Sequence, residues 1–242
     1  MPRFSRFALA LAAAVATTMM VPIVAQALPT TELLGKHGPV VPLKNAAMLT
    51  QSKWGYRYYA GQQDSRLTVR MVDRKLLYVD AGTKELRKIP KTCERKSVKR
   101  GVAALCKVPA RWHGGKAMFL EIWPRLGDDF VDTSALPARF RSWVLADAGR
   151  DVVRTGAGND FVNGAQDADR VSGGSGNDWL RTGLGNDEIY GGAGNDKLVG
   201  VDGSDRIHAG AGSDFVGCGN GRDRAMVDRA DRSWKCESVA RY

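Results

Sequence analysis

The feature that most constrains the fold is a nine-residue repeat that runs without a break from Ala146 to Met226. Aspartate fills position six in all nine units, an apolar residue fills position eight in all nine, and glycine fills position four in eight. So short a period predicts a solenoid, because each unit can bury its apolar face only against neighbouring turns. We expect the glycine-rich part of each unit to form a turn and its last three residues to form a very short strand, paired in parallel with the next turn.

Three consecutive units, which begin at Gly173, Thr182 and Gly191, have the sequences GGSGNDWLR, TGLGNDEIY and GGAGNDKLV. They closely resemble the RTX, or haemolysin-type, calcium-binding repeat, whose pattern is G-G-x-G-x-D-x-U-x. The resemblance extends over a third of the chain. It implies a parallel β-roll with about eighteen residues per turn, in which position-six carboxylates and glycine carbonyls hold Ca²⁺ between stacked turns.

The spacing of the aspartates also indicates a cation without reference to any family. Two units per turn place the position-six side chains in two columns, where neighbours about 4.8 Å apart would repel by roughly 3 kcal/mol at an effective dielectric constant of about 20. Hard oxygen ligands favour Ca²⁺ as the balancing ion. The alternative is that the aspartates only close Asx-turns. That role would not require an aspartate at the same position of all nine units with glycines on either side, so it explains the pattern less well. The columns contain Asp151, Asp169, Asp187, Asp205 and Asp223 on one side, and Asp160, Asp178, Asp196 and Asp214 on the other.

Positions seven and nine are expected to point outward, and alternate units are expected to build opposite sheets. One outer face should therefore be aromatic and the other basic. We expect Phe161 and Trp179 to be neighbours, covered by another part of the chain or available to a partner. The position-seven residues are Phe161, Trp179, Lys197 and Phe215 on one sheet, and Val152, Arg170, Glu188, Arg206 and Arg224 on the other.

Residues 1–27 have the composition of a secretory signal peptide. Arg3 and Arg6 precede an apolar run from Ala8 to Val21, and Ala25 to Ala27 form a small-residue cleavage site. We expect cleavage after Ala27 and a secreted, extracellular protein; an uncleaved membrane anchor, the alternative, fits the cleavage site less well. No other stretch is apolar for long enough to span a bilayer.

The chain has four cysteines, an even number that suggests two disulfides in an exported protein. Three pairings are possible, and the local one, Cys93 with Cys106 and Cys218 with Cys236, is favoured. A zinc site is the alternative, but no C-x-x-C motif or histidine cluster supports it.

Residues 28–145 are predicted to form a β-rich N-terminal module of strands and hairpins. Short alternating apolar runs occur at 67–71, 76–79, 118–123 and 140–145, with turn signals such as His113-Gly114-Gly115 between them. The segment 124–132 matches the repeat at Gly127, Asp129 and Val131, which suggests a degenerate first turn. The predicted fold class is thus all-β, a parallel β-roll (β-solenoid) preceded by this module.

A solenoid needs closed ends, because an open terminal turn exposes core and strand edges. The N-terminal module is expected to close one end, and residues 227–242 to form a C-terminal cap at the other. This layout resembles that of small exported calcium-binding proteins of actinobacteria. It differs from that of RTX toxins, which are far longer and have no N-terminal signal.

Charge is divided unevenly along the chain. Residues 28–145 contain 22 Lys and Arg against 10 Asp and Glu, whereas residues 146–226 contain 8 against 13. The densest basic segment is 84–107. A solvated basic face is one interpretation; the functional one is attachment to an anionic cell-surface polymer or membrane surface. Nucleic acid is not expected as a partner of an exported chain that has no recognition fold.

Catalytic signals are scarce. His37, His113 and His208 are scattered, and no HExxH, GxSxG or P-loop motif is present. The sequence favours an exported, non-enzymatic calcium-binding protein. Two alternatives stay open: an exported hydrolase or toxin with a calcium-dependent roll, and a surface-adhesion module that uses the basic segment. The oligomeric state is not predicted.

Overall fold

The computed structural model describes residues 45–242, so the predicted signal peptide lies outside the described residues. In this range the chain forms two eleven-stranded sheets, here called sheet A and sheet B. The one helical segment among the described residues is the 3₁₀ turn η1 (Ala110–Trp112). No helix of these residues has the length and hydropathy needed to cross a membrane.

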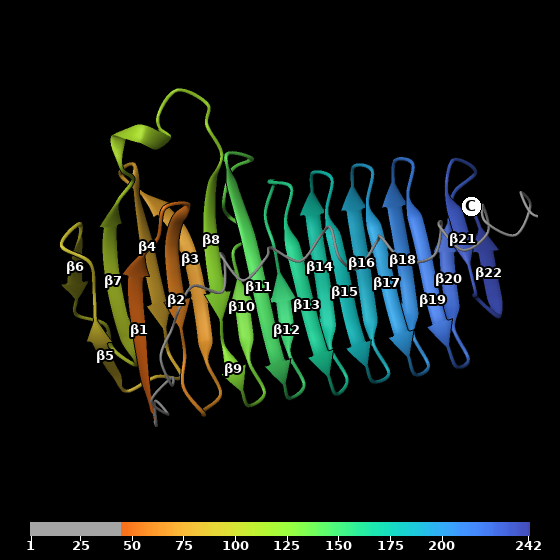
Figure 1. Ribbon diagram of the computed structural model, residues 1–242, viewed down its shortest axis with the longest axis horizontal. Coiled ribbons are helices and arrows are strands. Elements are labelled where there is room, and N and C mark those ends of the chain that lie inside the picture. Colours follow the sequence, from red (N-terminus) through yellow and green to blue (C-terminus); the bar gives the residue numbers. More distant parts are fainter. Residues whose placement is uncertain (1–44) are drawn as a thin grey trace, which may run out of the picture. The chain divides into compact units, whose positions relative to one another are not determined.

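Successive strands of the repeat region alternate between the two sheets, which stack face to face along the whole array (Figure 1). Sheet A contains β11 (Phe140–Ala148), β13 (Phe161–Gln166), β15 (Trp179–Leu184), β17 (Lys197–Asp202) and β19 (Phe215–Asn220). Sheet B contains β12 (Val152–Arg154), β14 (Arg170–Ser175), β16 (Glu188–Ala193), β18 (Arg206–Ala211) and β20 (Arg224–Val227).

Strand pairing confirms the predicted parallel β-roll and its period. Phe161 lies beside Trp179, and Val171 beside Ile189, each pair eighteen residues apart on parallel strands. The position-eight side chains form the core between the sheets, and each is at most 1% exposed. They point inward because side chains alternate across a strand, so positions seven and nine point to the opposite side.

The expectation of three-residue strands was wrong for most of the array. Strand β15, for example, runs for six residues, from position seven of one unit to position three of the next. Successive turns have the same backbone conformation. The ladder of backbone hydrogen bonds between them therefore continues wherever the chain stays extended, including at the glycine-rich positions. Position one consequently points into the core, as buried Thr182 does, and only positions four to six are left as the turn.

Phe161 and Trp179 pack together on the outer face of sheet A, as the period predicted, whereas Phe215, expected on the same face, lies beyond Lys197 and is 42% exposed. The ring centroids of Phe161 and Trp179 are 5.1 Å apart, and Trp143 of β11 extends this pair into a row, 4.7 Å from Phe161. Phe161 is only 8% exposed because it lies between two tryptophans. Lys197 ends the row, with its Nζ 4.6 Å from the Trp179 ring.

Both sheets continue into the N-terminal part of the chain, and the predicted strands are present there. The predicted boundary between 145 and 146 falls inside β11. Sheet A continues through β8 (Met118–Trp123), β2 (Gly55–Tyr59), β1 (Ala46–Gln51) and β5 (Glu85–Lys88), with β9 (Arg125–Leu126) beside β11. Sheet B continues through β10 (Phe130–Asp132), β3 (Arg66–Val72), β4 (Lys75–Asp80), β7 (Val102–Lys107) and β6 (Cys93–Lys96).

Strand direction distinguishes this N-terminal part from the repeats. Pairing is parallel from the repeats as far as β2 and β3, and then becomes antiparallel between β1 and β2 and along β3, β4, β7 and β6. Hairpins are possible here because antiparallel strands can be joined by short turns. At the other end, β21 (Arg232–Trp234) and β22 (Ser238–Arg241) add the last parallel strand to each sheet.

Both predicted disulfides are present. Cys93 and Cys106 are direct neighbours on β6 and β7, in the last pair of strands of sheet B. Cys218, in the last repeat, is bonded to Cys236 in the C-terminal tail. Each disulfide therefore fastens one end of the stack, where a strand has a neighbour on only one side.

Candidate metal centre

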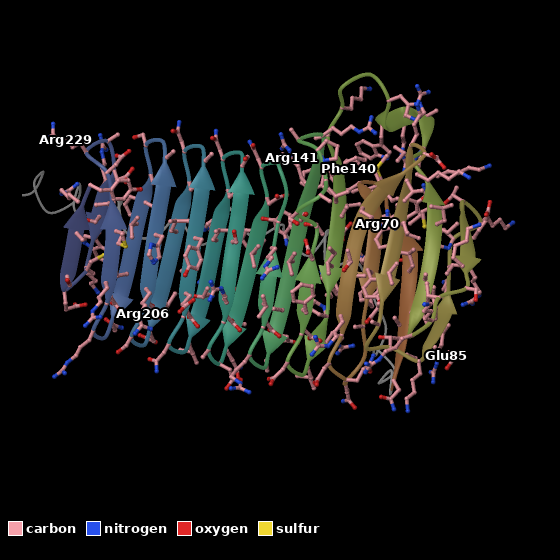
Figure 2. The ribbon with its side chains drawn as sticks, turned by 180° about the vertical axis from the view of Figure 1, so that it is seen from behind. Arg70, Glu85, Phe140, Arg141, Arg206 and Arg229 are labelled. Carbon is pink, nitrogen blue, oxygen red and sulfur yellow. A yellow bond between two sulfur atoms is a disulfide. The ribbon has the colours of Figure 1, made fainter. Side chains whose placement is uncertain are left out.

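The structure brings the nine predicted aspartates together in the two expected columns, one along each edge of the roll. Each side chain is buried, with an exposed fraction of 1 to 3%. The turns that contain Asp151, Asp169 and the rest of the first column form the lower edge in Figure 1, and those of the second column form the upper edge. Arg206, labelled in Figure 2, directly follows a first-column aspartate at that lower edge.

Within each column, one carboxylate oxygen accepts a hydrogen bond from the turn before. The backbone N–H of each aspartate donates to Oδ1 of the aspartate eighteen residues later, and the donor–acceptor distances are 2.7 to 3.0 Å. In the first column the donors are Asp151, Asp169, Asp187 and Asp205. In the second they are Asp160, Asp178 and Asp196.

The second carboxylate oxygen, Oδ2, lacks any hydrogen-bond donor at eight of the nine predicted aspartates, although the atom is buried. The exception is Asp160, whose Oδ2 accepts the N–H of Gly156 at 3.1 Å. An unpaired buried polar atom loses its hydration without compensation, and the cost is larger when the group is charged. The regular recurrence of this defect indicates that these atoms have a partner of another kind.

Burial makes the carboxylates hard to ionise when no cation is bound. It is the main reason that the pKa of Asp169 and of Asp178 rises to about 8 and that of Asp205 to about 7. The like charge of neighbouring aspartates in the column raises these pKa values further. The pKa of Asp214, near the end of its column, rises only to about 6.

Glycine at position one leaves room beside the unpaired oxygen. A Cβ on Gly191 would lie 2.7 Å from Asp196 Oδ2 and would clash with the carbonyl oxygen of Ala209 in the next turn. Gly164, Gly173 and Gly200 have the same two kinds of neighbour, a position-six Oδ2 and a carbonyl oxygen from position one of the next turn. Carboxylate and carbonyl oxygens therefore converge at the same point of successive turns.

The donor set fits a calcium-type ion and requires the backbone. Among residues 45–242, no three His, Cys, Asp or Glu side chains lie close enough together to hold a metal by themselves. Carbonyl oxygens from the turns must therefore complete any coordination shell. Ca²⁺ accepts such mixed oxygen ligands in flexible geometry, whereas softer metals prefer nitrogen and sulfur.

Three further carboxylates, which lie outside the nine predicted ligands, continue the columns. Asp129 N–H donates to Asp151 Oδ1 at 2.8 Å, Asp214 N–H donates to Asp231 Oδ1 at 2.8 Å, and Asp223 N–H donates to Glu237 Oε2 at 2.8 Å. The separations are 22, 17 and 14 residues, not 18. The constant period therefore gave no signal for these three contacts, apart from the match of the segment around Asp129.

Parallel strands in two stacked sheets, with buried and evenly spaced carboxylates in the turns between them, define a β-solenoid of the β-roll class. The family model of the RTX calcium-binding nonapeptide repeat matches the chain four times, at residues 143–171, 163–198, 172–206 and 190–225. Residues 143–225 are thus RTX calcium-binding repeats, as the resemblance indicated. No curated protein and no solved structure matches the chain.

Proposed function

We propose that this chain is an exported calcium-binding protein without catalytic activity, in which the roll folds stably only when Ca²⁺ is held between successive turns. The observation that supports this most directly is the row of buried, unpaired Oδ2 atoms along both columns. A bound Ca²⁺ would supply the positive charge that these oxygens lack. The position-six aspartates would act as its anionic ligands, and the position-one carbonyl oxygens as neutral ones.

Calcium binding and folding are expected to be one process. Without the ion, the columns bring together buried carboxylates that raise each other's pKa, so the stacked state is penalised relative to the unfolded chain. An ion that binds only the stacked turns stabilises the fold by mass action. The five and four aspartates of the two columns leave four and three gaps between turns, so we expect about seven ions to bind within the repeats, by the geometry of stacked units.

Calorimetric titration of the mature full-length chain with CaCl₂, paired with far-UV circular dichroism, tests this proposal. We expect several equivalents to bind and β-structure to increase in parallel, with no such change when MgCl₂ replaces CaCl₂ at the same concentration, because Mg²⁺ tolerates irregular ligand sets poorly. Absence of Ca²⁺ binding at millimolar concentration, or a spectrum that is the same in chelator and in calcium, would contradict it.

Attachment to an anionic surface polymer is a second candidate function, supported by the position of the basic segment. All nine Lys and Arg residues between 84 and 107 are exposed, and the segment contains the end strands β5 and β6. Figure 2 shows side chains with nitrogen tips projecting around this end, where Glu85 is labelled. Such charges also protect edge strands from pairing with other chains, which is the simpler explanation.

Co-sedimentation with an insoluble polyphosphate-type polymer at low and high salt separates these two explanations. Attachment predicts retention that is lost when Lys84, Lys88, Lys91 and Lys99 are replaced together by Gln, and that falls steeply with ionic strength. If the same variant instead aggregates and retention is unchanged, edge protection is the better account.

A further inference from the structure

The turn formed by residues 124–132 has the backbone of a repeat turn, although it lies outside the family match. Left-handed φ angles occur at its positions two and four, +82° at Arg125 and +118° at Gly127. The corresponding residues of a well-matched repeat, Gly192 and Gly194, have φ angles of +113° and +135°. Arginine adopts this conformation rarely, so the surrounding structure must impose it.

The hydrogen bonds of this turn are also those of a repeat. Gly127 N–H donates to Ala148 O at 3.0 Å, as Gly194 N–H donates to Ala211 O at 2.8 Å. Position-five residues are linked in the same way: Arg150 N–H donates to Asp128 Oδ1 at 2.9 Å, as Asn177 N–H donates to Asn159 Oδ1 at 3.1 Å in the repeats. A Cβ on Gly149 would clash with the carbonyl oxygen of Gly127, so the two turns stack as closely as repeats do.

Asp129 occupies the position-six place in this turn and shows the same defect as the repeat aspartates. Its side chain is 2% exposed, and its Oδ1 accepts the N–H of Ser65 at 2.5 Å. Its Oδ2 is buried and has no hydrogen-bond partner, and neither has Oδ2 of Asp151 in the next turn. Two unpaired buried oxygens thus belong to adjacent turns of one column.

The other carboxylates outside the repeats lack this combination. Asp231 has both oxygens paired, with Oδ1 accepting from Asp214 N–H and Oδ2 from Asp228 N–H at 2.6 Å. Glu237 is exposed to solvent, so its free oxygen can be hydrated. Ser65, which precedes Asp129 in the column, has a hydroxyl that donates to Asp80 at 2.8 Å. Asp129 alone among them has a buried oxygen without a partner.

We propose that Asp129 is a ligand of an additional divalent-cation site, of the oxygen-preferring class, between its own turn and that of Asp151. The inference rests on the proposed calcium binding by the repeats and extends it to a turn that the repeat pattern does not include. The site would link the roll to the N-terminal part, because the same side chain accepts the N–H of Ser65, which precedes β3, and β10 pairs with β3.

Calcium stoichiometry in a matched pair of variants tests the site. Asp129→Asn keeps an oxygen for the Ser65 N–H but removes the charge, whereas Asp132→Asn removes the same charge three residues away, where the side chain bonds only Ser134 of its own loop. Calorimetric titration of the full-length chain with CaCl₂ should show one ion fewer for Asp129→Asn and the wild-type number for Asp132→Asn. An unchanged number and midpoint in Asp129→Asn would overturn the inference.

Hydrogen exchange of the unaltered protein gives a second test that does not depend on whether a variant folds. Adding CaCl₂ should slow exchange of the Ser65 and Phe130 amides at least tenfold, since both belong to the turns that the site would join. If the repeat amides gain protection and these two do not, the additional site is absent while calcium binding by the repeats stands. If no amide gains protection, the proposed function itself fails.

Discussion

Two buried aspartates, one from each part of the chain, show how differently the same residue can be accommodated. Asp80, at the end of β4, is 1% exposed and accepts five hydrogen bonds, from the hydroxyls of Tyr58, Ser65 and Thr83 and from two backbone N–H groups. Asp187, in the middle of the repeats, is equally buried, but one of its oxygens has no partner. Protein donors satisfy both oxygens of the first carboxylate, whereas one oxygen of the second is left without a donor.

The difference follows from how each part is built. The antiparallel hairpins of the N-terminal part place unlike residues beside one another, so hydroxyl donors can meet a carboxylate. In the repeats every turn places an aspartate next to the equivalent aspartate of the neighbouring turn, so fewer donors of other kinds reach its second oxygen. Under the proposed function, an ion bound between the units supplies the partner that the remaining oxygen lacks.

Removal of calcium should have the largest effect on stability, and it should destabilise the repeats more than the N-terminal part. In chelator, amides of β14 to β19 are expected to lose most of their protection from hydrogen exchange, because the carboxylate columns are then uncompensated. Amides of β3, β4 and β7 should keep more of theirs, since a disulfide and satisfied hydrogen bonds hold these strands. Equal loss of protection in both parts would show that the sheets unfold as one unit and that the two parts do not differ in their dependence on calcium.

Replacing Asp80 or Asp187 by alanine should destabilise the protein, but the two losses of stability should depend differently on calcium. Asp80→Ala leaves buried donors unpaired and should destabilise the protein by at least about 3 kcal/mol in calcium and in chelator alike. Asp187→Ala should destabilise the protein much more in calcium than in chelator, because in chelator it removes only the acceptor of the Asp169 N–H and an oxygen that has no partner. Thermal melts of both variants in the two buffers give the answer, and the same destabilisation of Asp187→Ala in chelator would contradict it.

Stacking distance can be probed with a pair of glycines. Gly194 has a φ of +135°, and a Cβ there would clash with the carbonyl oxygen of Gly176 in the turn before, whereas a Cβ on Gly217 would meet nothing closer than 3.6 Å. Gly194→Ala should therefore cost about 1–3 kcal/mol, and Gly217→Ala almost nothing. Melting temperatures in saturating calcium measure both; similar values for the two variants would mean that the turns can separate without penalty.

A smaller effect is expected from pH in the absence of calcium. The pKa values of Asp169 and Asp178, raised to about 8 chiefly by burial, mean that the folded state retains protons that the unfolded state has released. Stability in chelator should be highest below about pH 4, where both states are protonated, and should fall as pH rises through about 8. Melting curves recorded in chelator between about pH 4 and pH 8 test the direction of this change, and a rise in stability with pH would contradict it. In calcium the trend should weaken or reverse, because the ligands must be deprotonated.

The sequence by itself determined the repeat architecture, since an unbroken nine-residue period admits little except a stacked roll. It also placed the nine aspartates in two columns and the apolar position eight in the core, and it favoured the disulfide pairs that the structure shows. These features depend on local periodicity, which stacking converts directly into neighbours. The period did not reveal that position one also points inward, because the mixture of Gly, Thr, Ala and Cys at that position gives no consistent apolar signal.

Only the tertiary structure decided how the rest of the chain joins the roll. Asp129, Asp231 and Glu237 reach the columns across 22, 17 and 14 residues, and loops of unequal length between equivalent positions leave no period to detect. The continuation of both sheets into antiparallel hairpins is likewise set by long-range pairing, such as that of Gly55 with Phe119. Contacts between residues so far apart in the chain are chosen by the packing of the whole sheet, which no local pattern encodes.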